Sequence, residues 1–130
     1  MPKTGEKGWP LIESLFDEDV VVSAKIPSAV TLKRYGLNQE EWQALLKTQG
    51  GVCAVCRKLP KNGRLCTDHE HIKGWKKLSA EKRKLSVRGM LCFFCNHYYV
   101  GRAITVAKAR NILSYLLAYE NRKGRKNVGN

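Results

Sequence analysis

Two Cys-x-x-Cys pairs constrain the fold of this chain more than any other feature. The first pair is Cys53 with Cys56, and the second is Cys92 with Cys95. A two-residue spacing lets a tight turn bring both sulfurs of a pair to one ion, and two such pairs complete a tetrahedral zinc site without an open position. We therefore expect a structural zinc ion that joins the two flanks of residues 53–95. The rival interpretation, two redox dithiols, lacks a thioredoxin-like context.

The remaining cysteine and the apolar content indicate the compartment. Cys66 makes the cysteine count odd, which argues against a simple disulfide framework, and we expect a free thiol packed as a small apolar group. Met1–Lys7 lacks the apolar core of a signal peptide, and no apolar run approaches the roughly 18 residues that span a bilayer. We expect no membrane partner and an intracellular, cytoplasmic setting.

Charge is distributed unevenly along the 130 residues. The net charge is +13, with −2 in residues 1–45 and +15 in residues 46–130. A basic half this strong predicts a polyanionic partner, of which DNA is the simplest. The alternative is a basic surface that serves solubility alone.

The elements expected around the cysteine pairs form a small α+β domain. We predict a helix over 37–50 capped by Asn38, a turn at 61–63, strands over 64–69 and 87–91, and a helix from Cys95 to Tyr99. A basic loop, 72–86, contains a short helix that starts at Ser79. Residues 1–33 form an N-terminal extension, with a short helix at 11–16 and a strand at 20–23. Residues 102–130 supply a helix over 104–120 and a mobile basic tail, and residues 34–101 form the core.

A cluster of polar side chains lies between the cysteine pairs. Asp68 stands near the end of the first strand and Asn96 at the start of the following helix, and both offer the oxygen ligands that Mg²⁺ or Mn²⁺ takes. His69 is suited to take a proton from water near neutral pH. In a regular strand His69 would share a face with Leu65 and Thr67, unless a bulge re-aims the strand end.

Several residues near this cluster keep alternatives. Asn96 is a metal ligand or a helix cap, while His71 and His97 either support the site or are simply exposed. Trp75 either stacks on a base or packs within its loop. We expect core positions around the zinc for four aromatic residues: Phe93, Phe94, Tyr98 and Tyr99.

Four runs of residues together resemble one enzyme family. They are Tyr35-Gly-Leu-Asn-Gln-Glu-Glu-Trp42, Gln49-Gly-Gly-Val-Cys-Ala-Val-Cys56, Asp68-His-Glu-His71 and Val87-Arg-Gly-Met-Leu-Cys-Phe-Phe-Cys-Asn96. In this order they resemble HNH endonucleases of the recombination endonuclease VII type, many of them phage-encoded. The resemblance implies the ββα-metal (HNH, His-Me finger) fold, with zinc on the four paired cysteines. It also implies catalytic metal on Asp68 and Asn96, His69 as general base and an accessory role for His71.

Three departures limit what the resemblance implies. The basic segment between Asp68-His-Glu-His71 and Val87 is longer than in many members, so its substrate contacts are not inherited. Cys66 stands where the junction-resolving type has a histidine, and the 35 residues after Cys95 are too few for long swapped helices. We therefore expect the nuclease chemistry without the Holliday-junction specificity.

The sequence thus predicts a divalent-metal-dependent DNA endonuclease that nicks DNA or cuts both strands, acting as a monomer or weak dimer in the host cytoplasm if phage-encoded. The alternatives are a Holliday-junction or branch resolvase and a zinc-stabilised DNA-binding module without catalysis. Phage terminase or portal proteins become candidate partners if the protein acts in DNA packaging. The basic residues expected on the DNA backbone are Arg88, Lys73, Lys76, Lys77, Lys82, Arg83 and Lys84.

Overall fold

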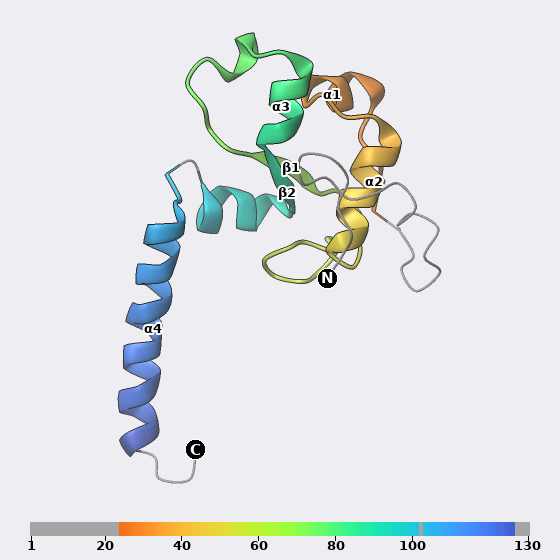
Figure 1. Cartoon of the computed structure of the whole chain (residues 1–130). Coiled ribbons are helices and arrows are strands. Elements are labelled where there is room, and N and C mark those ends of the chain that lie inside the picture. The colour runs from red at the N-terminus through yellow and green to blue at the C-terminus, as the bar shows by residue number, and fades with distance from the viewer. Residues whose placement is uncertain (1–23, 102, 127–130) are drawn as a thin grey trace. The chain divides into compact units, whose positions relative to one another are not determined.

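The computed structural model describes residues 24–101 and 103–126, which fall into two compact units that divide after Tyr99 (Figure 1). The expected helix at 11–16 and strand at 20–23 lie outside these residues. The first unit is a small α+β fold, as predicted, in which helices accompany a two-stranded sheet. Its elements are α1 (Ala29–Arg34), α2 (Gln39–Thr48), β1 (Cys66–His69), the 3₁₀ turn η3 (Trp75–Lys77), α3 (Ala80–Ser86), β2 (Val87–Leu91) and the π-helix η4 (Cys95–Val100).

The sheet places the polar cluster at its irregular end. β1 and β2 pair antiparallel, with Cys66 opposite Leu91 and Asp68 opposite Gly89. His69 is opposite Val87, so Arg88 is an extra residue and the ladder contains a bulge there. The β-bulge that the sequence allowed as an alternative to a regular strand end is therefore present. Asp68 is buried at 5% exposure, whereas the neighbouring His69 is partly open to solvent.

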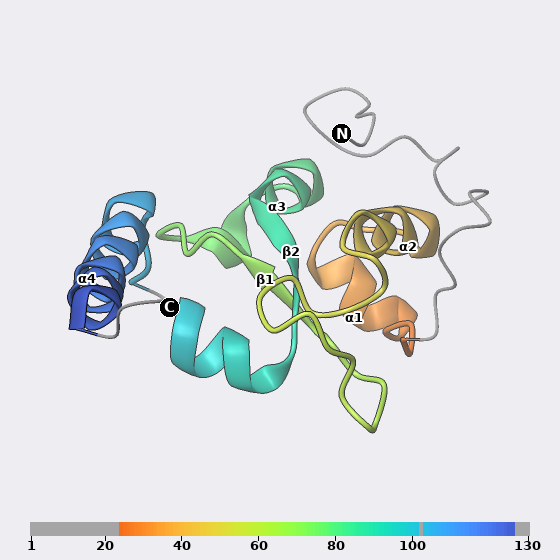
Figure 2. The same ribbon diagram turned by 90° about the horizontal axis from the view of Figure 1, so that it is seen from below.

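Helix α2 supports the sheet from one side (Figure 2). It begins with the predicted capping box, in which the side chains of Asn38 and Glu41 each accept a hydrogen bond from the other residue's backbone N–H, at 2.8 and 3.0 Å. Trp42 and Leu46 are fully buried, and the Trp42 indole N–H donates to Thr67 Oγ1 of β1 at 3.3 Å. This bond fixes the helix against the strand that carries Asp68.

Gln49 joins three segments in a way that the sequence did not reveal. Its buried side-chain amide donates to the carbonyls of Val52 and Met90, at 2.9 and 2.8 Å, and its Oε1 accepts from the Met90 N–H at 2.9 Å. The side chain thus acts as a short extra strand beside β2. A Cβ atom at Gly89 would lie 2.6 Å from Gln49 Oε1, which explains the glycine in β2.

Helix α1 was not predicted, because six residues with one buried side chain give no periodic pattern. Ser28 caps it by accepting from the Thr31 N–H at 3.3 Å. Gly36 follows with φ of +73°, and a Cβ atom there would lie 2.0 Å from the Ala80 carbonyl oxygen. Only glycine therefore lets this turn approach the start of α3, which Ser79 caps as predicted.

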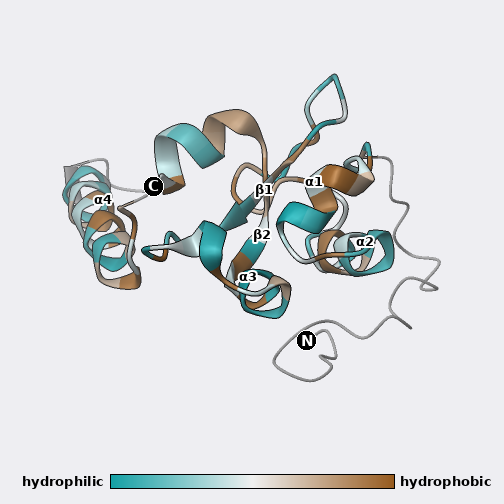
Figure 3. Cartoon of the chain, turned by 90° about the horizontal axis from the view of Figure 1, so that it is seen from above, coloured by the Kyte–Doolittle hydropathy of each residue, from teal (hydrophilic) through white to brown (hydrophobic). Residues whose placement is uncertain are grey.

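The second unit contains α4 (Val106–Lys126), which begins two residues later and ends six residues later than predicted. Arg122–Lys126, expected as a tail beyond the helix, continues the helix. Hydrophobic residues recur along α4 (Figure 3), and the side chains of Ile112, Leu113 and Leu116 are more than half exposed. In the described ranges no helix is both long and apolar enough to cross a membrane.

We predict that Gln49→Ala lowers the free energy of unfolding by about 3 kcal/mol, because it leaves buried backbone groups of Val52 and Met90 without partners. Denaturant unfolding of the zinc-loaded protein measures this change. Gln43→Ala in the same helix is the matched control and should have little effect. Equal losses in the two variants would contradict the bridging role of Gln49.

Candidate functional site

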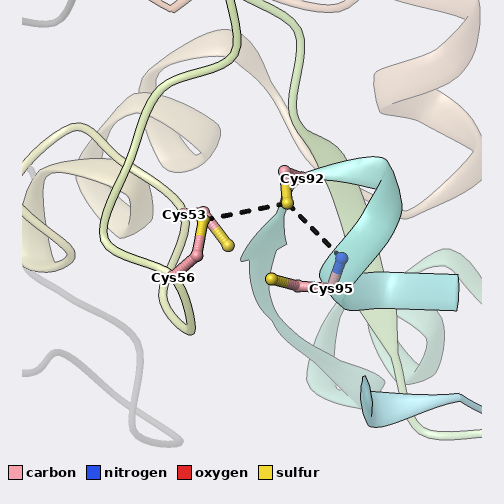
Figure 4. Close-up of side chains that lie close together, drawn as sticks. All are labelled: Cys53, Cys56, Cys92 and Cys95. Carbon is pink, nitrogen blue, oxygen red and sulfur yellow. Dashed lines mark hydrogen bonds between the residues drawn. The ribbon is translucent and has the colours of Figure 1, made fainter. Parts of the chain in front are cut away.

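Four cysteine sulfurs converge where the loop after α2 meets the end of β2. The sulfurs of Cys53, Cys56, Cys92 and Cys95 all lie within 4.8 Å of one another, and those of Cys56 and Cys92 are 3.9 Å apart (Figure 4). A tetrahedral zinc ion with Zn–S bonds of about 2.3 Å requires sulfurs about 3.8 Å apart. The donor set and its spacing therefore fit zinc, and the predicted clustering of the four cysteines is confirmed. Cys66 lies outside this group.

Each cysteine pair forms a turn that points backbone N–H groups at sulfur. The Val55 N–H lies 3.4 Å from Cys53 Sγ, and the Cys95 N–H lies 3.4 Å from Cys92 Sγ. The first turn is attached to β2, because the Ala54 N–H donates to the Met90 carbonyl at 3.2 Å. The two turns are thus held together by the sheet as well as by their thiols.

The thiols influence one another's pKa strongly. Burial tends to raise the pKa of the Cys53 thiol, but backbone N–H groups of Cys92, Cys56 and Val55 outweigh this and lower it to about 6. Burial and hydrogen bonds with the neighbouring thiols raise the pKa of Cys95 to about 12. Such a cluster readily holds one negative charge, and a bound dication stabilises the thiolate form of the rest.

Asp68 is held by the extra residue of the bulge. The Arg88 guanidinium donates to both carboxylate oxygens, at 2.7 Å from Nε and 3.0 Å from the second nitrogen. This pairing stabilises a buried carboxylate that would otherwise lack compensation. Each carboxylate oxygen keeps a second lone pair, so Asp68 can still act as a metal ligand.

His69 is fixed through one ring nitrogen and one ring face. Its Nδ1 lies 2.9 Å from the Glu70 carbonyl oxygen, and because a carbonyl only accepts, Nδ1 carries the proton in this bond. In the neutral ring Nε2 then has a free lone pair. The ring stacks on Trp75 with centroids 4.1 Å apart and planes at 12°, and His71 lies 4.7 Å away at 38°.

Trp75 belongs to the basic loop and orders it. Its indole N–H donates to Ser86 Oγ at 2.8 Å, and the Arg83 guanidinium lies 6.0 Å from the ring. Arg83 also donates to the carbonyls of Arg34 and Leu78. Of the two expectations for Trp75, the structure shows packing within the loop, against the histidine expected to act as base.

The basic residues expected on DNA differ in their contacts within the protein. Lys84 forms an ion pair with Glu41, Arg83 holds the loop, and Arg88 holds Asp68. Arg88 is nevertheless exposed, and so are four lysines of the segment 72–86: Lys73, Lys76, Lys77 and Lys82.

Asn96 lines a hollow of about 650 Å³ together with Tyr35, Cys66 and Phe93. Among the described residues its side chain makes no hydrogen bond, so the alternative of a helix cap is not what this structure shows. Asp68 is not among the residues that line this hollow, but it lies near enough to Tyr35, which does line it, to influence the pKa of the Tyr35 phenol.

Tyr35 is the residue of this site to which the sequence assigned no role. Its ring lies 5.8 Å from His69 and 5.6 Å from Trp75, and it also lines the hollow of Asn96. Burial raises the pKa of the Tyr35 phenol, and nearby Cys66 and Asp68 act in the same direction against Arg34. The phenol therefore remains a hydrogen-bond donor near neutral pH. The one sequence feature that could have indicated a role for Tyr35 is its position at the start of the run Tyr35–Trp42, which resembles the endonuclease family.

The expectation that four aromatic residues form core around the zinc was wrong. Within η4 the buried residue is Cys95, and the short helix can turn only that position toward the cysteine cluster. The exposed fractions lie between 53 and 66% for Phe93, Phe94, Tyr98 and Tyr99. His97 is also exposed, stacked on Phe93 at 5.4 Å.

Comparison with known proteins gives the family of this site. The model of the family described as "Recombination endonuclease VII" matches residues 28–119, well over half of the chain. The chain belongs to the recombination endonuclease VII family. The match includes the four clustered cysteines, the Asp68–Arg88 pair, His69 and Asn96, which confirms the family predicted from the quoted runs.

Part of this chain is similar to two curated phage proteins. The Gene 59 protein of Mycobacterium phage D29 is 38% identical over 73 residues, and that of Mycobacterium phage L5 is 36% identical over 73 residues. In both cases the match covers 55% of this chain and 38% of the phage protein. The chain thus spans well under half the length of these relatives. No solved structure matches it.

We predict that Cys53→Ala loses zinc and the cooperative thermal transition, because a structural zinc ion contributes folding free energy directly. Cys66→Ala is the matched control, since Cys66 lies outside the cluster. Zinc content and thermal melting measure both effects. The same zinc content and melting temperature in wild type and Cys53→Ala would contradict a structural zinc site.

Proposed function

We propose that this protein is a DNA endonuclease that hydrolyses phosphodiester bonds with a divalent metal ion and a histidine base. The observation that carries the proposal is the anchoring of His69. His69 directly follows the buried Asp68, and its Nδ1–H donates to the Glu70 carbonyl. The chain that carries this arrangement belongs to the recombination endonuclease VII family. An anchored neutral imidazole with a free Nε2 is the arrangement that a general base needs.

His69 would take the proton of the attacking water on Nε2. The Glu70 carbonyl and the Trp75 ring fix the imidazole in two directions, so its lone pair keeps one orientation while the proton moves. The imidazolium that forms is stabilised by the hydrogen bond from Nδ1 to the carbonyl. His71, whose ring lies beside His69, would take the accessory role near the scissile phosphate.

Asp68 and Asn96 would hold the catalytic Mg²⁺ or Mn²⁺. A buried carboxylate with free lone pairs and a carboxamide that makes no hydrogen bond within the described part of the chain are suitable hard ligands. When bound, such an ion stabilises the charge that develops on the phosphate and on the leaving 3′ oxygen. Arg88 balances the charge of Asp68 in this structure, and its guanidinium would also bind a substrate phosphate.

DNA as substrate is supported by charge and by the family. Residues 46–130 carry a net charge of +15, and four exposed lysines lie in the segment whose Trp75 stacks on His69: Lys73, Lys76, Lys77 and Lys82. Contacts of these lysines with DNA phosphates would release counterions and make binding fall steeply with salt. Partnership with terminase or portal proteins and action as a monomer or weak dimer remain predictions.

A second candidate, cleavage restricted to branched DNA, is favoured by the description of the family as a recombination endonuclease. A substrate panel separates the two functions. Comparable cleavage rates on plain duplex and on four-way junctions support the general endonuclease, whereas cleavage of junctions alone supports the resolvase.

We predict that the protein converts supercoiled plasmid to nicked or linear product with Mg²⁺ or Mn²⁺. His69→Ala should be at least about 100-fold slower, because general base catalysis contributes that much. The exposed His97 gives the matched control, and His97→Phe, which removes the imidazole but keeps a ring to stack on Phe93, should keep its rate. Undiminished cleavage by His69→Ala would refute the mechanism. Wild-type protein that binds DNA but cleaves none with either metal would favour a DNA-binding module.

We predict that Trp75→Leu lowers kcat about tenfold with KM nearly unchanged, because the His69 ring loses the surface that orients it. Trp75→Phe also lacks the indole N–H that reaches Ser86 but keeps an aromatic face, so it should retain most of the rate. NMR gives an independent measure: the ring-current shift of the His69 ring protons should persist in the Phe variant and vanish in the Leu variant. A similar kcat in both variants would show that stacking does not position His69.

A further inference from the structure

A second hollow, of about 500 Å³, lies beside the cysteine cluster, on the loop between the first cysteine pair and β1. Cys56 and Cys92 belong to its wall, so the metal site fixes its shape. Among the described residues that line it there is no aspartate or glutamate. Its lining includes three cations and two aromatic rings: Lys58, Lys61, Arg64, Phe93 and Phe94.

The basic side of the hollow is a fixed turn. The Gly63 N–H donates to the Pro60 carbonyl at 2.8 Å, and the Arg64 N–H donates to Asn62 Oδ1 at 2.9 Å. The Lys25 N–H donates to the Gly63 carbonyl at 2.7 Å and holds the turn to the preceding chain. These hydrogen bonds fix the backbone from which the exposed side chains of Lys61 and Arg64 extend. Three cations without an acidic neighbour in the wall favour an anionic ligand.

The aromatic side offers ring faces that are already oriented. Phe93 is 66% exposed and stacks parallel to His97, at 5.4 Å and 8°. Phe94 is 53% exposed and is held by Tyr98 at 4.7 Å and Tyr99 at 5.3 Å. Rings that are ordered before binding lose little rotamer freedom on binding. Exposed aromatic rings next to cations are the combination that binds single-stranded nucleic acid.

We propose that this hollow binds an unpaired segment of the DNA substrate, with bases on Phe93 and Phe94 and phosphates on Lys58, Lys61 and Arg64. The proposal rests on the proposed nuclease function and adds to it a separate binding site for unpaired DNA. Bases within a duplex are stacked on one another and cannot offer their faces to a protein ring. The hollow therefore distinguishes unpaired DNA from duplex DNA.

Position connects the hollow to the candidate active site. Arg64 and Phe93 also line the hollow that contains Asn96 and Tyr35. A strand seated beside the cysteine cluster would continue over these two residues toward Asn96. Unpaired DNA bound here is thus adjacent to the place where cleavage is proposed.

The test measures binding without cleavage. Full-length zinc-loaded protein carrying His69→Ala is titrated, without added divalent metal, into a fluorescent single-stranded oligonucleotide that contains 2-aminopurine and into the matched duplex. Adding Phe93→Leu and Phe94→Leu should weaken single-strand binding about tenfold or more, since each stacked base contributes that much. Duplex binding should change little, and the quenching of 2-aminopurine should be lost.

Tyr115→Leu is the matched control, because Tyr115 is an aromatic residue on α4 that is even more exposed than Phe93 and Phe94. Zinc content and circular dichroism establish that each variant is folded. Unchanged single-strand affinity in the Phe93, Phe94 variant would overturn the proposal, as would an equal loss for duplex. A dimer in solution that the two substitutions dissociate would assign the hollow to a second copy instead. Because no step of this assay is catalytic, failed plasmid cleavage counts against the nuclease proposal alone.

Discussion

The convergence of four cysteine sulfurs is the constraint on which the rest of the first unit depends. A sheet of two strands, β1 with four residues and β2 with five, is only marginally stable in water. The cysteine cluster fastens the end of β2 to the loop after α2, and Gln49 adds three hydrogen bonds to the same junction. A zinc ion in this cluster would therefore hold the register of the sheet, although it takes no part in the chemistry.

The candidate chemistry follows from that register. The pairing of β1 with β2 leaves Arg88 as the extra residue, and its guanidinium then holds the buried carboxylate of Asp68. The next residue, His69, turns outward to Trp75 and to its carbonyl anchor. Asn96 is fixed because it directly follows Cys95. The proposed ligand and base, both on β1, and the carboxamide of Asn96 on η4 thus come from two segments that the cysteine cluster and the sheet hold together.

Local signals in the sequence predicted much of this structure. Cysteine spacing identified the cluster, the Asn38 and Glu41 pattern identified the start of α2, and Val87–Leu91 was predicted with its observed ends. Features that depend on contacts between distant segments were not predicted, such as the Gln49 bridge or the stacking of Trp75 on His69. Composition misplaced the four aromatic residues around the second cysteine pair, because an apolar residue near a metal site need not face it. A six-residue helix such as α1 leaves no periodic signal.

The central claim is that the protein has two separate metal sites, a structural one of thiolates and a catalytic one of oxygen ligands. Anomalous diffraction at the zinc and manganese absorption edges, from crystals grown with Mn²⁺, tests it most directly. The account predicts a zinc signal among the sulfurs of the four clustered cysteines and a separate manganese signal at the Asp68 carboxylate. Crystals saturated with Mn²⁺ that show no metal at Asp68, or manganese only among the sulfurs, would contradict it.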